Sequence, residues 1–86
     1  MRRQPAFFGD RELNLIYIAK RLRDALRLEE ALTEAGIDYA VETDAYRGGM
    51  IFVSERVGAF FYVDDRVLDA AHEIMRQSGF QPWRPF

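Results

Sequence analysis

The sequence predicts an α+β fold, an open-faced sandwich in which two helices cover one face of a three- or four-stranded sheet. The apolar run 13–19 has strand character and is followed directly by amphipathic helical periodicity over 20–35. The aromatic run 59–63 is followed in the same way by helical periodicity over 65–78. Because each element must bury one apolar face, the economical packing places both helices on the same side of the sheet. The order, βαββα or βαβββα, is that of a ferredoxin-like plan.

The length of the chain fits one domain. Its 86 residues are 49% hydrophobic, enough for one small core, and include no cysteine, so no disulfide supports that core. We therefore expect a single domain over residues 1–86, with an N-terminal arm at 1–11, a core at 12–79 and a C-terminal tail at 80–86. Pro82 and Pro85 make this tail extended rather than helical.

The first strand and the first helix follow from their patterns. The run 13–19 is apolar at nearly every position, which is typical of a strand buried on both sides and central in its sheet. The apolar stripe of the helix contains Leu22, Ala25, Leu26, Leu32 and Ala35, with Leu28 and Ala31 widening it. Gly36 stands where a left-handed C-terminal cap is expected.

The remaining strands are predicted in the second half of the chain. Residues 37–43 alternate as a half-buried strand, and 50–54 pairs with 59–63 as a hairpin connected by 55–58. One long bent strand with a bulge at Gly58 is the alternative.

The second helix has both of its end signals. Asp64 or Asp65 offers an N-cap, and Gly79 is a natural stop. Its apolar face consists of Val67, Leu68, Ala71, Ile74, Met75 and Ser78.

The aromatic residues of the last strand predict a contact surface. Alternate residues of a strand face opposite sides, so Phe61 and Val63 face the helices and their neighbours face away. The face without helices would then present Ile16, Ile18, Phe60 and Tyr62. Apolar patches of that size usually mark an interface. We therefore expect a homodimer, or another protein partner, at this face.

Two segments of the same chain are the alternative occupants of that face. The arm carries Phe7 and Phe8, and the tail carries Trp83 and Phe86. Either pair of aromatic side chains is large enough to fold over the sheet. The sequence leaves self-association and intramolecular cover equally open.

A group of cations at the start of the first helix gives a second functional hypothesis. Lys20, Arg21, Arg23 and Arg27 lie where the helix dipole disfavours positive charge. An anionic small ligand, such as a phosphate, would explain the group, and the protein would then be a ligand sensor. Neutralisation by nearby acids such as Asp10 or Glu12 is the alternative.

Other functional classes find little support. The net charge of −2, with acidic and basic residues mixed along the chain, argues against nucleic-acid binding. No apolar run approaches the roughly 20 residues that span a bilayer, and no secretory signal is recognisable, so we expect a cytoplasmic protein. His72 is the only histidine, and no catalytic or metal-binding motif occurs. We therefore expect no enzyme activity, no metal and no cofactor.

Two short motifs carry a resemblance to a known family. The segment 32–37, Leu-Thr-Glu-Ala-Gly-Ile, ends the first helix, and Val63 is followed eight positions later by Ala71, as in a V-x-x-x-x-x-x-x-A motif. In this order of elements, the motifs resemble a family of small bacterial signal-transducing proteins. The resemblance implies a ferredoxin-like fold and a regulatory role, and it assigns no functional residue. Together, these observations predict a small non-enzymatic binding or regulatory module that self-associates through its sheet.

Overall fold

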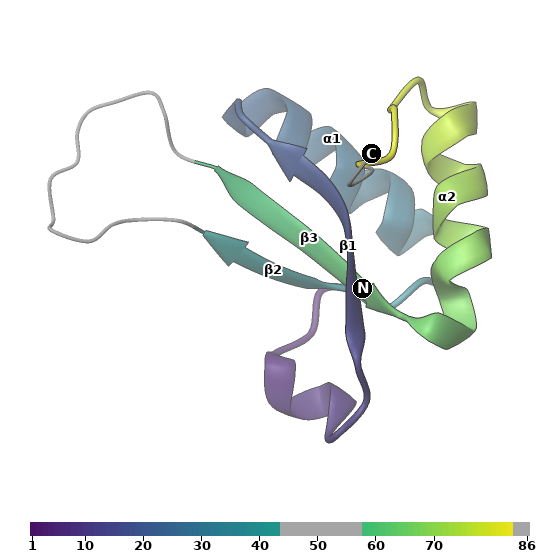
Figure 1. Ribbon diagram of the computed structural model, residues 1–86. Coiled ribbons are helices and arrows are strands. Elements are labelled where there is room, and N and C mark those ends of the chain that lie inside the picture. The colour runs from purple at the N-terminus through teal and green to yellow at the C-terminus, as the bar shows by residue number, and fades with distance from the viewer. Residues whose placement is uncertain (44–57, 84–86) are drawn as a thin grey trace, which may run out of the picture.

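The computed structural model describes residues 1–43 and 58–83 (Figure 1). In chain order, its elements are the 3₁₀ turn η1 (Pro5–Phe8), β1 (Leu13–Ala19), α1 (Leu22–Glu34), β2 (Ala40–Thr43), β3 (Ala59–Asp64), the 3₁₀ turn η2 (Asp65–Val67) and α2 (Leu68–Gln77). The predicted strand 50–54 and most of its hairpin connection lie outside the described residues. Within the described residues, no helix is long and apolar enough to cross a membrane.

The three described strands form one antiparallel sheet in the order β1-β3-β2. Because β1 and β2 both run antiparallel to β3, they are parallel to each other, and α1 connects them across β3. Both helices cover the same face of the sheet (Figure 1). The predicted open-faced α+β sandwich is confirmed. The central position predicted for 13–19 is wrong, because β3 is the middle strand.

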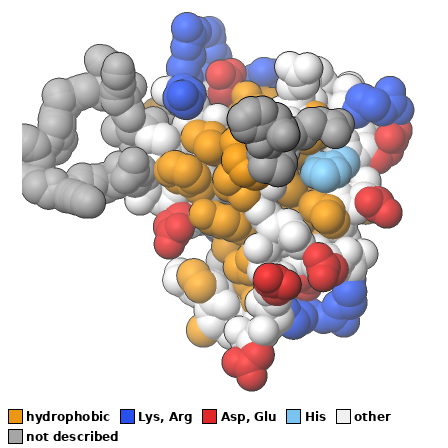
Figure 2. All heavy atoms as spheres, viewed as in Figure 1, with side chains coloured by type: hydrophobic (Ala, Val, Ile, Leu, Met, Phe, Trp, Pro, Cys, Tyr) orange, Lys and Arg blue, Asp and Glu red, His pale blue; other side chains and the backbone are white. Residues whose placement is uncertain are grey.

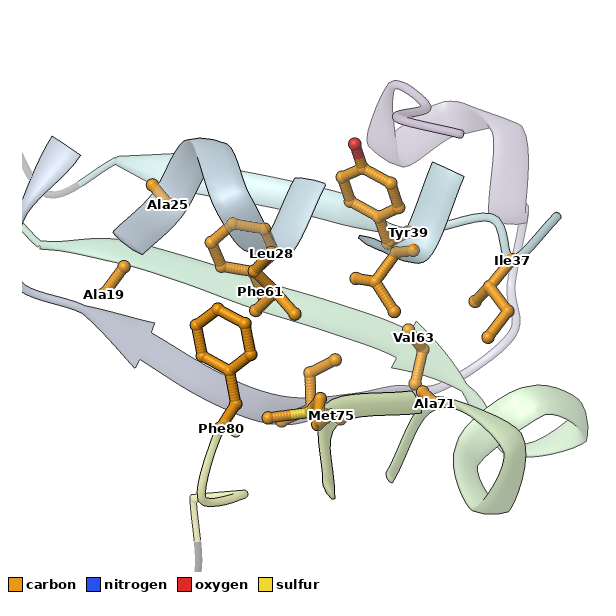
Figure 3. Close-up of a cluster of buried hydrophobic side chains, with 12 residues drawn as sticks. Ala19, Ala25, Leu28, Ile37, Tyr39, Phe61, Val63, Ala71, Met75 and Phe80 are labelled. Carbon is orange, nitrogen blue, oxygen red and sulfur yellow. The ribbon is translucent and has the colours of Figure 1, made fainter. Parts of the chain in front are cut away.

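The buried core lies between this sheet and the two helices (Figure 3). Phe61 and Val63 of β3 are fully buried beside Leu28 of α1 and Met75 of α2. Tyr39, just before β2, stacks on Phe61 with 5.9 Å between ring centroids. Phe61 and Val63 thus face the helices, as the alternation along this strand predicts.

The hydroxyl group of Tyr39 also has hydrogen-bond partners inside this layer. The hydroxyl oxygen lies 3.2 Å from the Thr33 hydroxyl and donates to the Glu29 carboxylate at 3.1 Å. A buried tyrosine needs such a partner, because an unpaired buried hydroxyl costs about 1–3 kcal/mol. These bonds fix α1 over β2.

The burial of α1 differs from the predicted stripe. Ala25, Leu28 and Leu32 are buried, but Leu22 is 75% exposed and Leu26 is 55% exposed. At 3.6 residues per turn, Leu22 and Leu26 lie about 90° and about 130° from the centre of the buried line. This buried line packs against the sheet and α2, and the two leucines lie to one side of it.

The ends of the helices follow the sequence signals closely. Gly36 and Gly79 have positive φ angles of 76° and 87°, which confirms both predicted caps. The side chain of Asp64 accepts a hydrogen bond from the Arg66 amide at 2.9 Å. This cap starts the turn η2, so the regular helix begins at Leu68.

Candidate functional site

The register of the sheet defines the face turned away from the helices, which we call the open face. Cross-strand partners point to the same side of a sheet. On β3, Phe60 and Tyr62 point away from the buried Phe61. Ile18 of β1 pairs with Phe60, and Leu15 of β1 pairs with Tyr62. Hydrophobic side chains gather over the strands in the view of Figure 2.

A β-bulge in β1 removes Ile16 from this face. The register shifts between Leu15 and Tyr17, so Ile16 has no partner of its own on β3. Ile16 is 0% exposed and belongs to the core on the helix side. Its predicted place in the interface is therefore wrong, whereas Ile18, Phe60 and Tyr62 do share the open face. Leu15 takes the place of Ile16.

The side chains of Leu15, Ile18, Phe60 and Tyr62 are half-buried, and Leu15 and Ile18 lie opposite Tyr62 and Phe60 in the register. A Cβ atom at Gly58 would meet the Phe60 ring at 3.3 Å and Ile18 at 3.7 Å. The absence of a side chain at Gly58 thus lets the Phe60 ring lie flat along the sheet beside Ile18. The result is a flat apolar surface.

Glu42 of β2 adds a polar border to the open face. It pairs with Phe60 in the register and is exposed. Burial raises the pKa of Tyr62, and the Glu42 carboxylate, as a charge and as a hydrogen-bond acceptor, raises it further. Tyr62 therefore acts as a neutral hydrogen-bond donor at the rim.

The N-terminal arm covers one end of the open face. The Arg3 amide donates to the Tyr39 carbonyl at 2.7 Å, so the start of the chain lies along the outer edge of the sheet beside β2. The chain must then cross beneath β2 and β3 to reach β1, and η1 lies at this crossing (Figure 1). Phe8 is buried there, and Ala40 on the open side of β2 is only 3% exposed.

The described part of the C-terminal tail lies on the other side of the sheet. Phe80 is buried in the helix-side core, in edge-to-face contact with Tyr17 at 5.2 Å. The Trp83 amide donates to the Ile16 carbonyl at 2.8 Å, along the outer edge of β1. Within the described residues, the arm is therefore the segment that covers part of the open face. Phe86 lies outside them.

The basic residues at the start of α1 do not form one cluster. Lys20, Arg21 and Arg23 are exposed near the beginning of the helix. Arg27 lies further along, where its guanidinium sits 4.7 Å from the Phe80 ring centroid and donates to the Ser78 carbonyl at 3.2 Å. Ser78 is the C-cap of α2, so the charge of Arg27 complements the negative end of that helix.

Titratable groups elsewhere in the described residues show no metal-binding cluster. His72 is half-buried on α2, and Glu73 on the same helix binds Arg76 and Gln77. The acids Asp10 and Glu12, considered above as neutralising partners, precede β1, whereas Lys20 and Arg21 follow its opposite end. These acids therefore lie about a strand length from the cations.

A pocket lies at the start of α1 beside Lys20 and Arg21, two residues of the predicted anion site, but the sequence analysis did not predict its apolar lining. Leu22 and Ala25 line it together with residues at the ends of the strands. The helical periodicity placed Leu22 in the core. The sequence therefore did not indicate that Leu22 is exposed beside a pocket. Comparisons with protein-family models, with curated proteins and with solved structures found no match for this chain.

Proposed function

We propose that this chain is a small non-enzymatic binding module that self-associates through its open face. The observation that carries the proposal is the adjoining set of partly exposed apolar side chains Leu15, Ile18, Phe60 and Tyr62 on the face of the sheet turned away from both helices. Neighbouring apolar side chains that face solvent on a small domain usually mark an interaction surface.

A second copy of the chain is the partner that suits this surface. Most soluble homodimers have two-fold symmetry, in which the same patch meets itself. An apolar centre with aromatic rings is self-complementary under this symmetry, and Glu42 with the Tyr62 hydroxyl supplies a polar rim. The arm limits the size of the patch, because it already occupies the end of the face near Ala40.

The limited area sets the strength of the proposed dimer. A standard interface buries about 800 Å² from each partner. Four half-buried side chains and their rim provide less than this, so we expect a dissociation constant in the micromolar range, about 8 kcal/mol of binding free energy or less. A weak dimer suits the regulatory role that the family resemblance implies, because small changes in free energy shift its population.

Sedimentation equilibrium over a range of micromolar concentrations tests the proposal. The wild-type chain should show a monomer–dimer equilibrium. The Ile18→Lys substitution should shift this equilibrium to the monomer, because the dimer would bury the unpaired lysine charge. Leu26→Lys is the matched control, since Leu26 is exposed on α1 away from the sheet. It should leave the equilibrium unchanged.

Far-ultraviolet circular dichroism must show that both variants keep the wild-type fold. A wild-type chain that stays monomeric throughout this concentration range would contradict the proposal. So would a folded Ile18→Lys variant that dimerises as well as the wild type.

A further inference from the structure

A pocket of about 390 Å³ lies on the helix side of the sheet, at the end where α1 begins. Three strands contribute to it through their end residues, Ala19 of β1, Thr43 of β2 and Ala59 of β3. The first turns of α1 and the residues before it complete the lining with Lys20, Arg21, Leu22 and Ala25. The volume falls within the range of about 300–1,000 Å³ that is usual for small-molecule sites.

Small side chains are the reason for the hollow. Ala19 is 2% exposed and Ala25 is 6% exposed, so both form the floor of the pocket. Ala59 shares their side of the sheet, because it pairs with Ala19. None of the three alanines reaches far enough to fill the space between sheet and helix. Leu22, 75% exposed, stands as an apolar wall beside them.

Two cations mark the mouth of the pocket. Lys20 and Arg21 both line it and are both exposed. Within the described residues, neither side chain takes part in a salt bridge, whereas Arg27 on the same helix contacts Asp24 and Ser78. Among the described residues, no carboxylate lines the pocket. The pocket thus combines an apolar interior with positive charge at one end.

We propose that this pocket binds an amphiphilic anion, an aliphatic chain that carries a terminal carboxylate. The chain would lie against the alanines and Leu22, and the carboxylate would meet Lys20 and Arg21 at the mouth. Charge complementarity selects the anionic head, and the apolar lining selects the aliphatic body. Inorganic phosphate does not fit the interior, because Thr43 is the only uncharged polar side chain that the described residues contribute to the lining.

Isothermal titration calorimetry with three probes separates the contributions of chain and charge. Decanoate, kept below its micelle-forming concentration, carries both features, decanol carries only the chain, and acetate carries only the charge. Decanoate should bind at least about tenfold more tightly than decanol, and acetate should show no measurable binding. Equal affinity for decanoate and decanol, or no binding of decanoate, would overturn the proposal.

Substitutions of the cations locate the site. The double variant Lys20→Gln, Arg21→Gln should lower the affinity for decanoate about tenfold, to the level of decanol. Arg23→Gln is the matched control, because Arg23 is an exposed cation of the same helix that does not line the pocket. An equal loss in the Arg23→Gln variant would show general charge attraction and would overturn the proposal.

Amide chemical shifts distinguish this pocket from the open face. Decanoate should shift the amides of Ala19, Ala25 and Ala59, and the Ile18→Lys variant should bind it as the wild type does. Shifts confined to Tyr62 and its neighbours would place the ligand on the open face instead and would overturn the assignment. The result is independent of whether the protein dimerises.

Discussion

The carboxylate of Asp64 joins three parts of the molecule. Its side chain is 10% exposed, accepts the Arg66 amide at 2.9 Å and forms an ion pair with Arg11 at 3.1 Å. Arg11 follows η1 and Asp64 ends β3, so this one group connects the arm, the sheet and the start of the second helical segment. A charge with this little exposure depends on its partners.

Replacing this carboxylate should therefore destabilise the fold strongly. We expect Asp64→Ala to lower the free energy of unfolding by about 1–3 kcal/mol, since it removes a cap and the carboxylate partner of Arg11. Asp38→Ala is the control. Asp38 also pairs with an arginine of the arm, Arg3 at 2.9 Å, but its side chain is 35% exposed, so the loss should stay below about 1 kcal/mol.

Urea unfolding followed by circular dichroism measures both variants. Similar losses in the two variants would mean that the burial of Asp64 contributes nothing beyond an ordinary surface ion pair.

At the scale of elements, α1 shows that amphipathic periodicity identifies a helix more reliably than it identifies the buried side chains. The sequence pattern places Leu22 and Leu26 on the apolar stripe and Leu28 at its margin. In the structure, Leu28 is 0% exposed and the other two are more than half exposed. The difference arises because the contact line of a helix depends on where the sheet and α2 lie, which the helix sequence does not specify.

This difference gives a stability prediction within one helix. Leu28→Ala should cost about 2–5 kcal/mol of unfolding free energy, because it leaves a cavity in the core. Leu22→Ala should change it by less than about 0.5 kcal/mol, since alanine has the higher helix propensity and little apolar area is lost. Chemical denaturation compares the two directly, and equal costs would contradict the observed burial of α1.

The strand β1 illustrates a second limit at this scale. Its run 13–19 is almost entirely apolar, so either set of alternating residues could face the helices. The bulge places both Ile16 and Tyr17 on the helix side, where Tyr17 contacts Phe80. No local pattern predicts such a bulge, since its position depends on the register with β3, more than forty residues away in the chain.

At the scale of the whole molecule, the two ends of the chain close the two outer edges of the sheet. The arm lies beside β2 through Arg3 and Tyr39, and the tail lies beside β1 through Trp83 and Ile16. Exposed sheet edges invite pairing with other chains, and these contacts leave fewer free backbone groups at the two edges for such pairing.

Three tyrosines make the free energy of unfolding of the whole molecule depend on pH in the alkaline range. Burial raises the pKa of Tyr17, Tyr39 and Tyr62, each from a different element or edge of the sheet. Because the folded-state pKa values exceed the unfolded value of about 10, the folded state holds these protons more tightly. This contribution is fully present below about pH 10 and is lost as the pH rises through the raised values.

We expect the free energy of unfolding to decrease above about pH 10 for this reason, as measured by urea unfolding at a series of pH values. Tyr39→Phe should be about 1 kcal/mol less stable at neutral pH, because it loses the bonds to Glu29 and Thr33. Its alkaline decrease should be shallower than that of the wild type. An identical pH dependence in the variant would exclude Tyr39 as a contributor.

The sequence by itself determined the order of the described strands and helices, the sandwich architecture, both glycine caps and the side of the sheet on which Phe61 lies. Each of these depends on a local pattern of a few neighbouring residues. Only the tertiary structure decided that β3 is central, that Leu15 replaces Ile16 on the open face, and that the arm covers one end of it. It also placed Arg27 at the end of α2 and left Leu22 beside a pocket. These features depend on contacts between residues far apart in the chain, and local periodicity carries no information about such contacts.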